Sequence, residues 1–234
     1  MSTHTIQVTN ASGNDQTYSL FYEPFVSQSN PPLPCITMKS EVVANGNNSS
    51  FPIELPSVVV CGNSLNTTLG QGVNINIGQS APITTPETVK INVQNNIPSF
   101  SSHTASCPDG DWAELSTMHY DYNPDANIFC GLGVKKTTGE VIPSCVWEIQ
   151  PTSNYPIPKL SQPLVFYITS NSGLEVGTIT TVEGVTPVAT VDFTGTGGTF
   201  CEVKQLPNNS FEVGKPTDAR TSQENENGTQ KGDL

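Results

Sequence analysis

The sequence is poor in charge, and most of the charge that it has is negative. Charged residues make up 13% of the 234 residues, about half of the roughly 25% that is usual in globular proteins. Lys and Arg number 9 against 21 Asp and Glu, which gives a net charge of −12. Only Lys135 and Lys136 are adjacent basic residues. Because phosphate backbones bind clustered basic residues, this balance argues against a nucleic-acid partner.

Long apolar runs are also lacking. No stretch approaches the ~20 apolar residues that a membrane-spanning helix requires, so we expect no transmembrane segment. Residues 1–18 have neither the basic region nor the apolar region of a secretory signal peptide. We therefore expect a cytoplasmic protein. A mature form with an added Met and leaderless secretion are the alternatives.

The six cysteines contain no C-x-x-C pair, which argues against a structural zinc site. An even number would suit disulfides in an oxidising compartment. Free cysteine is, however, a common core residue in its own right. We favour reduced, buried and unreactive thiols.

Asn, Ser, Thr, Gln and Gly supply the polarity that charge does not, and this composition favours strands and turns over helices. Residues 88–94 (TVKINVQ) alternate between polar and apolar, which is the period of a half-buried strand. Similar patterns predict strands at 4–9, 17–23, 35–44, 50–55, 57–62, 72–78, 128–135, 144–150, 163–169, 198–206 and 210–214. The fold class expected is all-β, a single β-sandwich or jelly-roll-like domain of about a dozen short antiparallel strands with one long loop and short-helix insertion.

Local patterns also predict how some strands connect. The turn cluster NASGND at 10–15 predicts that 4–23 is a hairpin, and PNNS at 207–210 predicts another at 198–214. The apolar run at 163–169 predicts a central strand. Beyond Lys215 almost no residue is apolar, so we expect a sandwich domain over 1–214 and a disordered hydrophilic tail over 215–234.

Three motifs resemble those of a group of small, poorly characterised fungal proteins. They are the opening IQVTNASGNDQTYSLF at 6–21, the strand end VVVCG at 58–62 and the segment FCGLG at 129–133. The resemblance covers most of the first 205 residues. It implies a β-sandwich, and it implies no particular activity and no catalytic residue.

The segment Pro98–Gly133 holds two of the three histidines and most of the candidate functional groups. Within it, Asp109, Asp111 and Glu114 allow two interpretations. Carboxylates at this spacing cap and charge the start of a short helix near 111–118. The alternative is a divalent cation site, because hard cations bind several oxygens from one loop. This cation is the only cofactor that the sequence indicates.

The sequence His119-Tyr120-Asp121 is the second candidate. On a strand, residues i and i+2 share a face, so His119 and Asp121 would point the same way. Such a pair, with Tyr120, could act in general acid–base catalysis. Neither a downstream histidine for an iron site nor a recognisable nucleophile motif accompanies it.

Aromatic residues among Asp, Asn and Gly form the third candidate. Trp112 and Tyr122, with His103 and Asn123, would make a ligand-binding surface on a loop held by a rigid sandwich. These aromatics could instead pack the long loop against the sheet.

Three functions follow from these candidates. The first is a soluble β-sandwich that binds a small molecule or glycan through the 103–127 region. The second is an enzyme of the cyclase, isomerase or lyase type that acts on an apolar small molecule with His119, Asp121 and a tyrosine as acid–base groups. It would work without a cofactor or with a metal. The third is a structural or interaction protein. We rank them in that order.

Overall fold

Short strands joined by turns make up the chain, as its composition predicts. The structure, a computed structural model, describes residues 4–22, 32–64, 67–83, 87–104, 113–157, 164–170 and 173–218. This part of the chain forms four β-sheets and a single turn of 3-10 helix, with no α-helix. The predicted all-β sandwich fold of many short strands is therefore confirmed, with the strands divided between two sandwiches.

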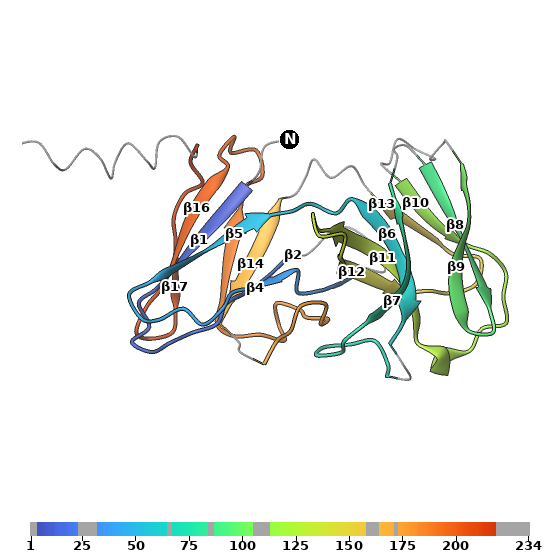
Figure 1. Ribbon diagram of the computed structural model, residues 1–234, viewed down its shortest axis with the longest axis horizontal. Coiled ribbons are helices and arrows are strands. Elements are labelled where there is room, and N and C mark those ends of the chain that lie inside the picture. Colours follow the sequence, from blue (N-terminus) through green and yellow to red (C-terminus); the bar gives the residue numbers. More distant parts are fainter. Residues whose placement is uncertain are drawn as a thin grey trace, which may run out of the picture.

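Two of the sheets pack into a first sandwich, on the left of Figure 1. One has the strand order β17 (Phe211–Val213), β16 (Phe200–Gln205), β1 (His4–Asn10) and β5 (Asn48–Ile53). The other has the order β15 (Val188–Asp192), β14 (Val165–Thr169), β2 (Ser19–Tyr22) and β4 (Met38–Lys39). Apolar side chains from both sheets, such as Ile6, Phe51, Ile168 and Val191, form one buried cluster between them.

The other two sheets pack into a second sandwich, on the right of Figure 1. One has the order β13 (Asn154–Ile157), β10 (Ala113–Thr117), β8 (Glu87–Gln94) and β9 (Ile97–Thr104). The other has the order β3 (Leu33–Pro34), β12 (Val141–Glu148), β11 (Ile128–Lys135), β6 (Val58–Asn63) and β7 (Asn76–Pro82).

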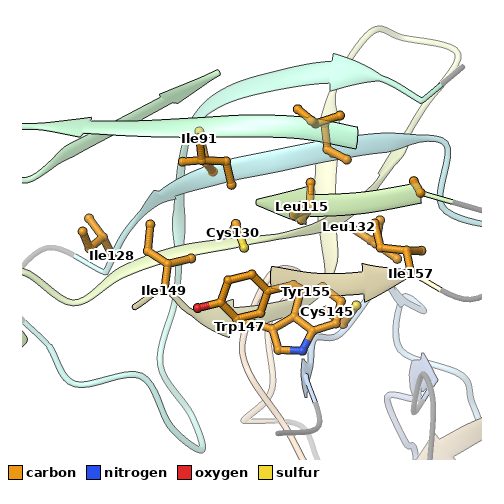
Figure 2. Packing of buried hydrophobic residues seen from close by; sticks show 14 of the residues in the cluster. Ile91, Leu115, Ile128, Cys130, Leu132, Cys145, Trp147, Ile149, Tyr155 and Ile157 are labelled. Atoms are coloured by element: carbon orange, nitrogen blue, oxygen red, sulfur yellow. The ribbon is translucent and has the colours of Figure 1, made fainter. Parts of the chain in front are cut away.

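One side of the core of the second sandwich comes from strands that alternate strictly, β8 and β10, and the other from the almost continuously buried strands β6, β11 and β12. Val89, Ile91 and Val93 of β8 are buried, and the residues between them are at least partly exposed. Figure 2 shows Ile91 and Leu115 from one sheet facing Cys130 and Trp147 from the other. The expected inward face of residues 88–94 is confirmed.

The chain crosses between the sandwiches more than once: β1 and β2 lie in the first, β3 in the second, β4 and β5 in the first again, β6 to β13 in the second, and β14 to β17 in the first. The first sandwich therefore contains strands from both ends of the described sequence (Figure 1). Polar contacts tie the two together where they meet. The Lys136 ammonium lies 2.8 Å from the Glu54 carboxylate. The Tyr22 hydroxyl lies 3.4 Å from the Ser144 hydroxyl.

The hairpin predicted over 4–23 is wrong. β1 pairs with β16 in parallel and with β5 antiparallel, whereas β2 pairs with β14 and β4. The turn cluster after β1 carries the chain from one sheet to the facing sheet. The hairpin predicted at 198–214 is confirmed, because β16 and β17 pair antiparallel. β14 is an internal strand of its sheet, as predicted for 163–169.

The helix expected near 111–118 is wrong for the residues that the structure describes. Ala113–Thr117 is strand β10, which lies between β8 and β13 and hydrogen-bonds to both. Ala113, Leu115 and Thr117 alternate inward and are buried. Two neighbouring strands therefore override the local capping pattern, because packing and pairing outweigh intrinsic propensity.

The start of the expected tail is ordered. The Thr217 amide donates to the Phe200 carbonyl at 2.8 Å, and the Phe200 amide donates to the Thr217 carbonyl at 3.0 Å. The expected disorder over 219–234 lies outside the described residues. In the part of the chain that is described, no helix is long and apolar enough to cross a membrane.

Ser19 of β2 gives a stability prediction. It is fully buried, and its hydroxyl is the one buried side-chain polar atom in the described residues that has no hydrogen-bond partner. Ser19→Ala should therefore leave the free energy of unfolding unchanged or raise it by about 1 kcal/mol. Ser144→Ala is the matched control, because the buried Ser144 hydroxyl donates to the Leu132 carbonyl. Urea unfolding of both variants would contradict the prediction if Ser19→Ala lost as much stability as Ser144→Ala.

Candidate ligand-binding cleft

A cleft of about 350 Å³ opens at one end of the second sandwich, within the usual size of small-molecule sites. Three chain segments meet there: the end of β6, the turn between β8 and β9, and the 3-10 turn η2 (Pro124–Ala126). We call it the Asn cleft. Its lining residues are Asn63, Asn95, Asn96, Ile97, Asn123, Asp125 and Ala126.

The β8–β9 turn supplies Asn95 and Asn96. Both have positive φ, 51° and 62°, and Gln94 pairs with Ile97 across the turn. A two-residue hairpin with positive φ at both central positions is a type I′ turn, which asparagine tolerates better than most residues. Backbone geometry therefore explains why asparagine occurs here. It leaves the two side-chain amides on the surface, where both residues are exposed.

The η2 turn holds Asn123, Asp125 and Ala126 through local hydrogen bonds. The Asn123 side chain accepts from the Asp125 amide at 3.0 Å, which caps the turn. At its other end Asn127 has φ 48°, and its side chain donates to the Asp125 carbonyl at 2.9 Å. The position of this wall of the cleft is therefore set by short-range bonds.

The lining is polar without being cationic. Four asparagines and one aspartate line the cleft, and no Lys, Arg or His is among the lining residues. Within the described residues, the side chains of Asn95 and Asn96 make no hydrogen bond. Each carboxamide offers two donors and one acceptor, so the cleft presents unused hydrogen-bonding groups of both kinds beside the single carboxylate of Asp125.

Tyr122, which precedes Asn123, is held in place although 42% of its surface is exposed. Its hydroxyl donates to the Glu148 carboxylate at 3.0 Å and accepts from the Gln150 amide at 3.0 Å. Tyr122 was predicted to bind ligand, and a fixed, exposed ring suits stacking. Asn123 was predicted to bind ligand too, and it lines the Asn cleft.

The predicted acid–base group is not assembled as the sequence pattern required. Residues 118–123 are irregular, so the strand that would align His119 with Asp121 is absent from this described segment. Both side chains are exposed, and no hydrogen bond joins them. Tyr120 is buried in the core, its hydroxyl donates to the Ile149 carbonyl at 2.8 Å, and burial raises its pKa. The catalytic role of these three residues stays a prediction.

His103 instead pairs with a residue that the sequence did not single out. Its Nδ1 lies 3.1 Å from an oxygen of Glu87, whose side chain is only 4% exposed. Glu87 begins β8 and continues the inward alternation of that strand, which places a carboxylate at the rim of the core. The Asn cleft lies at the other end of β8, so His103 is not among its lining residues.

The predicted cation site is mostly beyond what the structure describes. Asp109, Asp111 and the predicted ligand-binding residue Trp112 lie outside the described residues. Glu114 belongs to β10 and sits opposite Pro156 and Thr88, so it does not complete a helix-capping box. Among the described residues, no group of three or more His, Cys, Asp or Glu could hold a metal ion.

Five cysteines are buried free thiols, as predicted: Cys35, Cys61, Cys130, Cys145 and Cys201. Burial raises the pKa of Cys61 and Cys145 to about 12. Since the thiolate is the nucleophile, these groups are unreactive at neutral pH. Cys107 lies outside the described residues.

Sequence reasoning missed most of the cleft: Asn63, Asn95, Asn96, Ile97, Asp125 and Ala126. One signal was available, because the pair Asn95-Asn96 between two alternating runs predicts a tight hairpin turn. Nothing local indicates that this turn lies beside η2, which is some 30 residues away in the sequence.

Comparisons with protein-family models, with curated proteins and with solved structures found no match to this chain. The resemblance to the fungal group therefore stays a prediction. Within this chain, the residues that carry its motifs make structural contacts. Asn10 and Ser12 bond to each other in the first turn, and Gly62 and Gly131 lie where neighbouring backbone leaves no room for a side chain.

Proposed function

We propose that this protein is a binding module for a small uncharged glycan, which it holds in the Asn cleft. One observation carries the proposal: the cleft has the volume of a ligand site and is lined by four asparagines, two of which have side chains without hydrogen bonds to the described chain. Reversible binding, without turnover, is what such a lining supports.

Carboxamides match the chemistry of sugar hydroxyls. A hydroxyl both donates and accepts, and a carboxamide offers donors and an acceptor on one rigid plane. Neutral groups also avoid the large desolvation cost of charged ones. Several amides around one cleft therefore favour a ligand with many hydroxyls over an apolar one.

Electrostatics narrows the ligand class. The chain carries a net charge of −12, and Asp125 puts a carboxylate into the lining of a cleft that has no cation. An anionic ligand would meet repulsion both at a distance and at contact. Electrostatics therefore disfavours anionic ligands, including nucleic acids, and the uncharged carboxamides lead us to propose a neutral ligand.

The backbone that lines the cleft is fixed before a ligand arrives. Asn95 and Asn96 sit on a tight hairpin turn, and Asn123 and Asp125 are held by the bonds of η2. A backbone that is already ordered loses little entropy on binding, which raises affinity. Tyr122 precedes Asn123 in the sequence, and its ring is held through its hydroxyl, but it is not among the residues that line the cleft.

Replacing Asn95 and Asn96 by glycine tests the proposal. Glycine adopts positive φ at no cost, so N95G and N96G keep the hairpin turn and remove only the carboxamides. We expect each variant to weaken binding of neutral trisaccharides at least about tenfold, because each removes hydrogen bonds worth about 1.4 kcal/mol together. Isothermal titration calorimetry with a panel of neutral trisaccharides and one uronic-acid trisaccharide measures this.

Asn209→Gly is the matched control. Asn209 also has positive φ, 64°, but it lies in the β16–β17 turn of the first sandwich. The N209G variant should bind the trisaccharides as tightly as the wild-type protein does. Equal losses in all three variants, or preferential binding of the uronic-acid trisaccharide, would contradict a neutral glycan site in the Asn cleft.

A further inference from the structure

Two apolar residues line the Asn cleft together with the asparagines. Ile97 and Ala126 are both in its lining, and Ile97 is 65% exposed. A large apolar side chain exposed on a strand end contributes nothing to the core. At the edge of a polar cleft it gives a ligand an apolar contact within reach of the carboxamides.

From this combination we propose that the ligand of the Asn cleft is a glycan containing an N-acetylhexosamine, recognised through its acetamido group. This inference rests on the proposed function and specifies it. Its chemistry requires an amide partner and an apolar partner side by side, and the cleft supplies both.

The amide partner is a side-chain carboxamide. An acetamido group has one N–H donor and one carbonyl acceptor, and because its amide bond is trans the two groups point in opposite directions. One carboxamide can therefore donate to the acetamido carbonyl while a second accepts from the N–H, whereas a hydroxyl at the same position has one oxygen that must serve as both donor and acceptor. Asn95 and Asn96, whose side chains make no hydrogen bonds to the described chain, are the groups free to do this.

The apolar partner is Ile97 with Ala126. The methyl of an acetamido group loses its contact with water when it packs against apolar side chains, and that burial is favourable. A sugar with only hydroxyls has no methyl to place there. A sugar with a carboxylate would face Asp125, so neither alternative uses all parts of the cleft.

The test compares two trisaccharides that differ only in this group. The β-1,4-linked trimer of N-acetylglucosamine and the β-1,4-linked trimer of glucose have the same backbone, with acetamido groups replacing hydroxyls in the first. Calorimetry with the full chain should show at least tenfold tighter binding of the acetylated trimer, equivalent to about 1.4 kcal/mol. The deacetylated glucosamine trimer, which is cationic, completes the series.

Each outcome decides between the two proposals. Equal binding of the acetylated and glucose trimers overturns the N-acetyl inference and leaves the glycan site intact. Tightest binding of the deacetylated trimer also overturns the inference, because Asp125 would then select for charge. Binding of none of these trimers or the neutral panel overturns both proposals.

Ile97→Thr separates the methyl contact from the amide contact. Threonine keeps the branched Cβ that suits a strand and replaces apolar surface by a hydroxyl. I97T should weaken binding of the acetylated trimer about fivefold and leave that of the glucose trimer unchanged. Asn209→Gly should change neither. An equal loss of affinity for both trimers would show that Ile97 does not contact the acetamido methyl group.

Discussion

Replacing Gly131 by alanine is expected to lower the free energy of unfolding by about 3 kcal/mol or more. Gly131 lies in β11, the middle strand of the five-stranded sheet, between β6 and β12. An alanine Cβ there would overlap the carbonyl oxygen of Cys145 and lie 2.9 Å from Val146 Cα. Both obstacles are backbone of the neighbouring strand, so relief requires the sheet itself to move. Urea unfolding followed by fluorescence and circular dichroism measures the loss.

Gly78→Ala is the control for Gly131→Ala. Gly78 lies in β7 of the same sheet, and a Cβ there would sit 3.6 Å from the Cys61 carbonyl oxygen, which is ordinary contact. Alanine should therefore be tolerated, with a small gain because the unfolded chain loses freedom. If Gly131→Ala unfolded at the same urea concentration as wild type, the close approach of β11 and β12 would be wrong.

Replacing Asn10 by aspartate should cost about 3 kcal/mol of stability. Asn10 is fully buried at the end of β1, and its side-chain nitrogen donates to the carbonyl oxygens of Asn14, at 2.8 Å, and Val43, at 2.7 Å. Its side-chain oxygen accepts from the Ser12 amide and hydroxyl. A carboxylate keeps the second pair of bonds, but places an acceptor against two carbonyl oxygens. Buried groups left without donors cost about 1–3 kcal/mol, and more when one is charged.

Asn47→Asp makes the same chemical change at an exposed position in the loop before β5, whose backbone contacts Asn10. It should alter the free energy of unfolding by less than about 0.5 kcal/mol. Both variants can be compared in one urea series. Equal stability of the Asn10 and Asn47 variants would show that the first turn is not held by the Asn10 side chain.

Asn10 and its neighbours show that the opening motif at 6–21 has a structural role. Asn10, Ser12 and Gly13, with φ +91°, build the turn that carries the chain from one sheet of the first sandwich toward the other. Tyr18, later in the same motif, donates its hydroxyl to the buried Gln205 side chain at 2.8 Å. Conformation and hydrogen bonding account for these residues, and none of them lies in the Asn cleft.

The sequence by itself determined the fold class and much of the strand content. Polar residues that alternate with Val and Ile, as in 88–94, have one structure that buries every apolar side chain, and that is a strand. Short connections with strong turn residues, such as PNNS before Phe211, determined one hairpin as well. The burial of the cysteines followed from composition in the same way.

Only the tertiary structure decided which strands pair and which loops meet. β1 pairs with β16, nearly 200 residues away, and Ala113–Thr117 becomes a strand because β8 and β13 lie on either side of it. Asn95, Asn96 and Asn123 come together at one end of a sandwich for the same reason. Local pattern records the period of a strand and the type of a turn. It does not specify which strands pair, because strand pairing depends on how the whole core is buried.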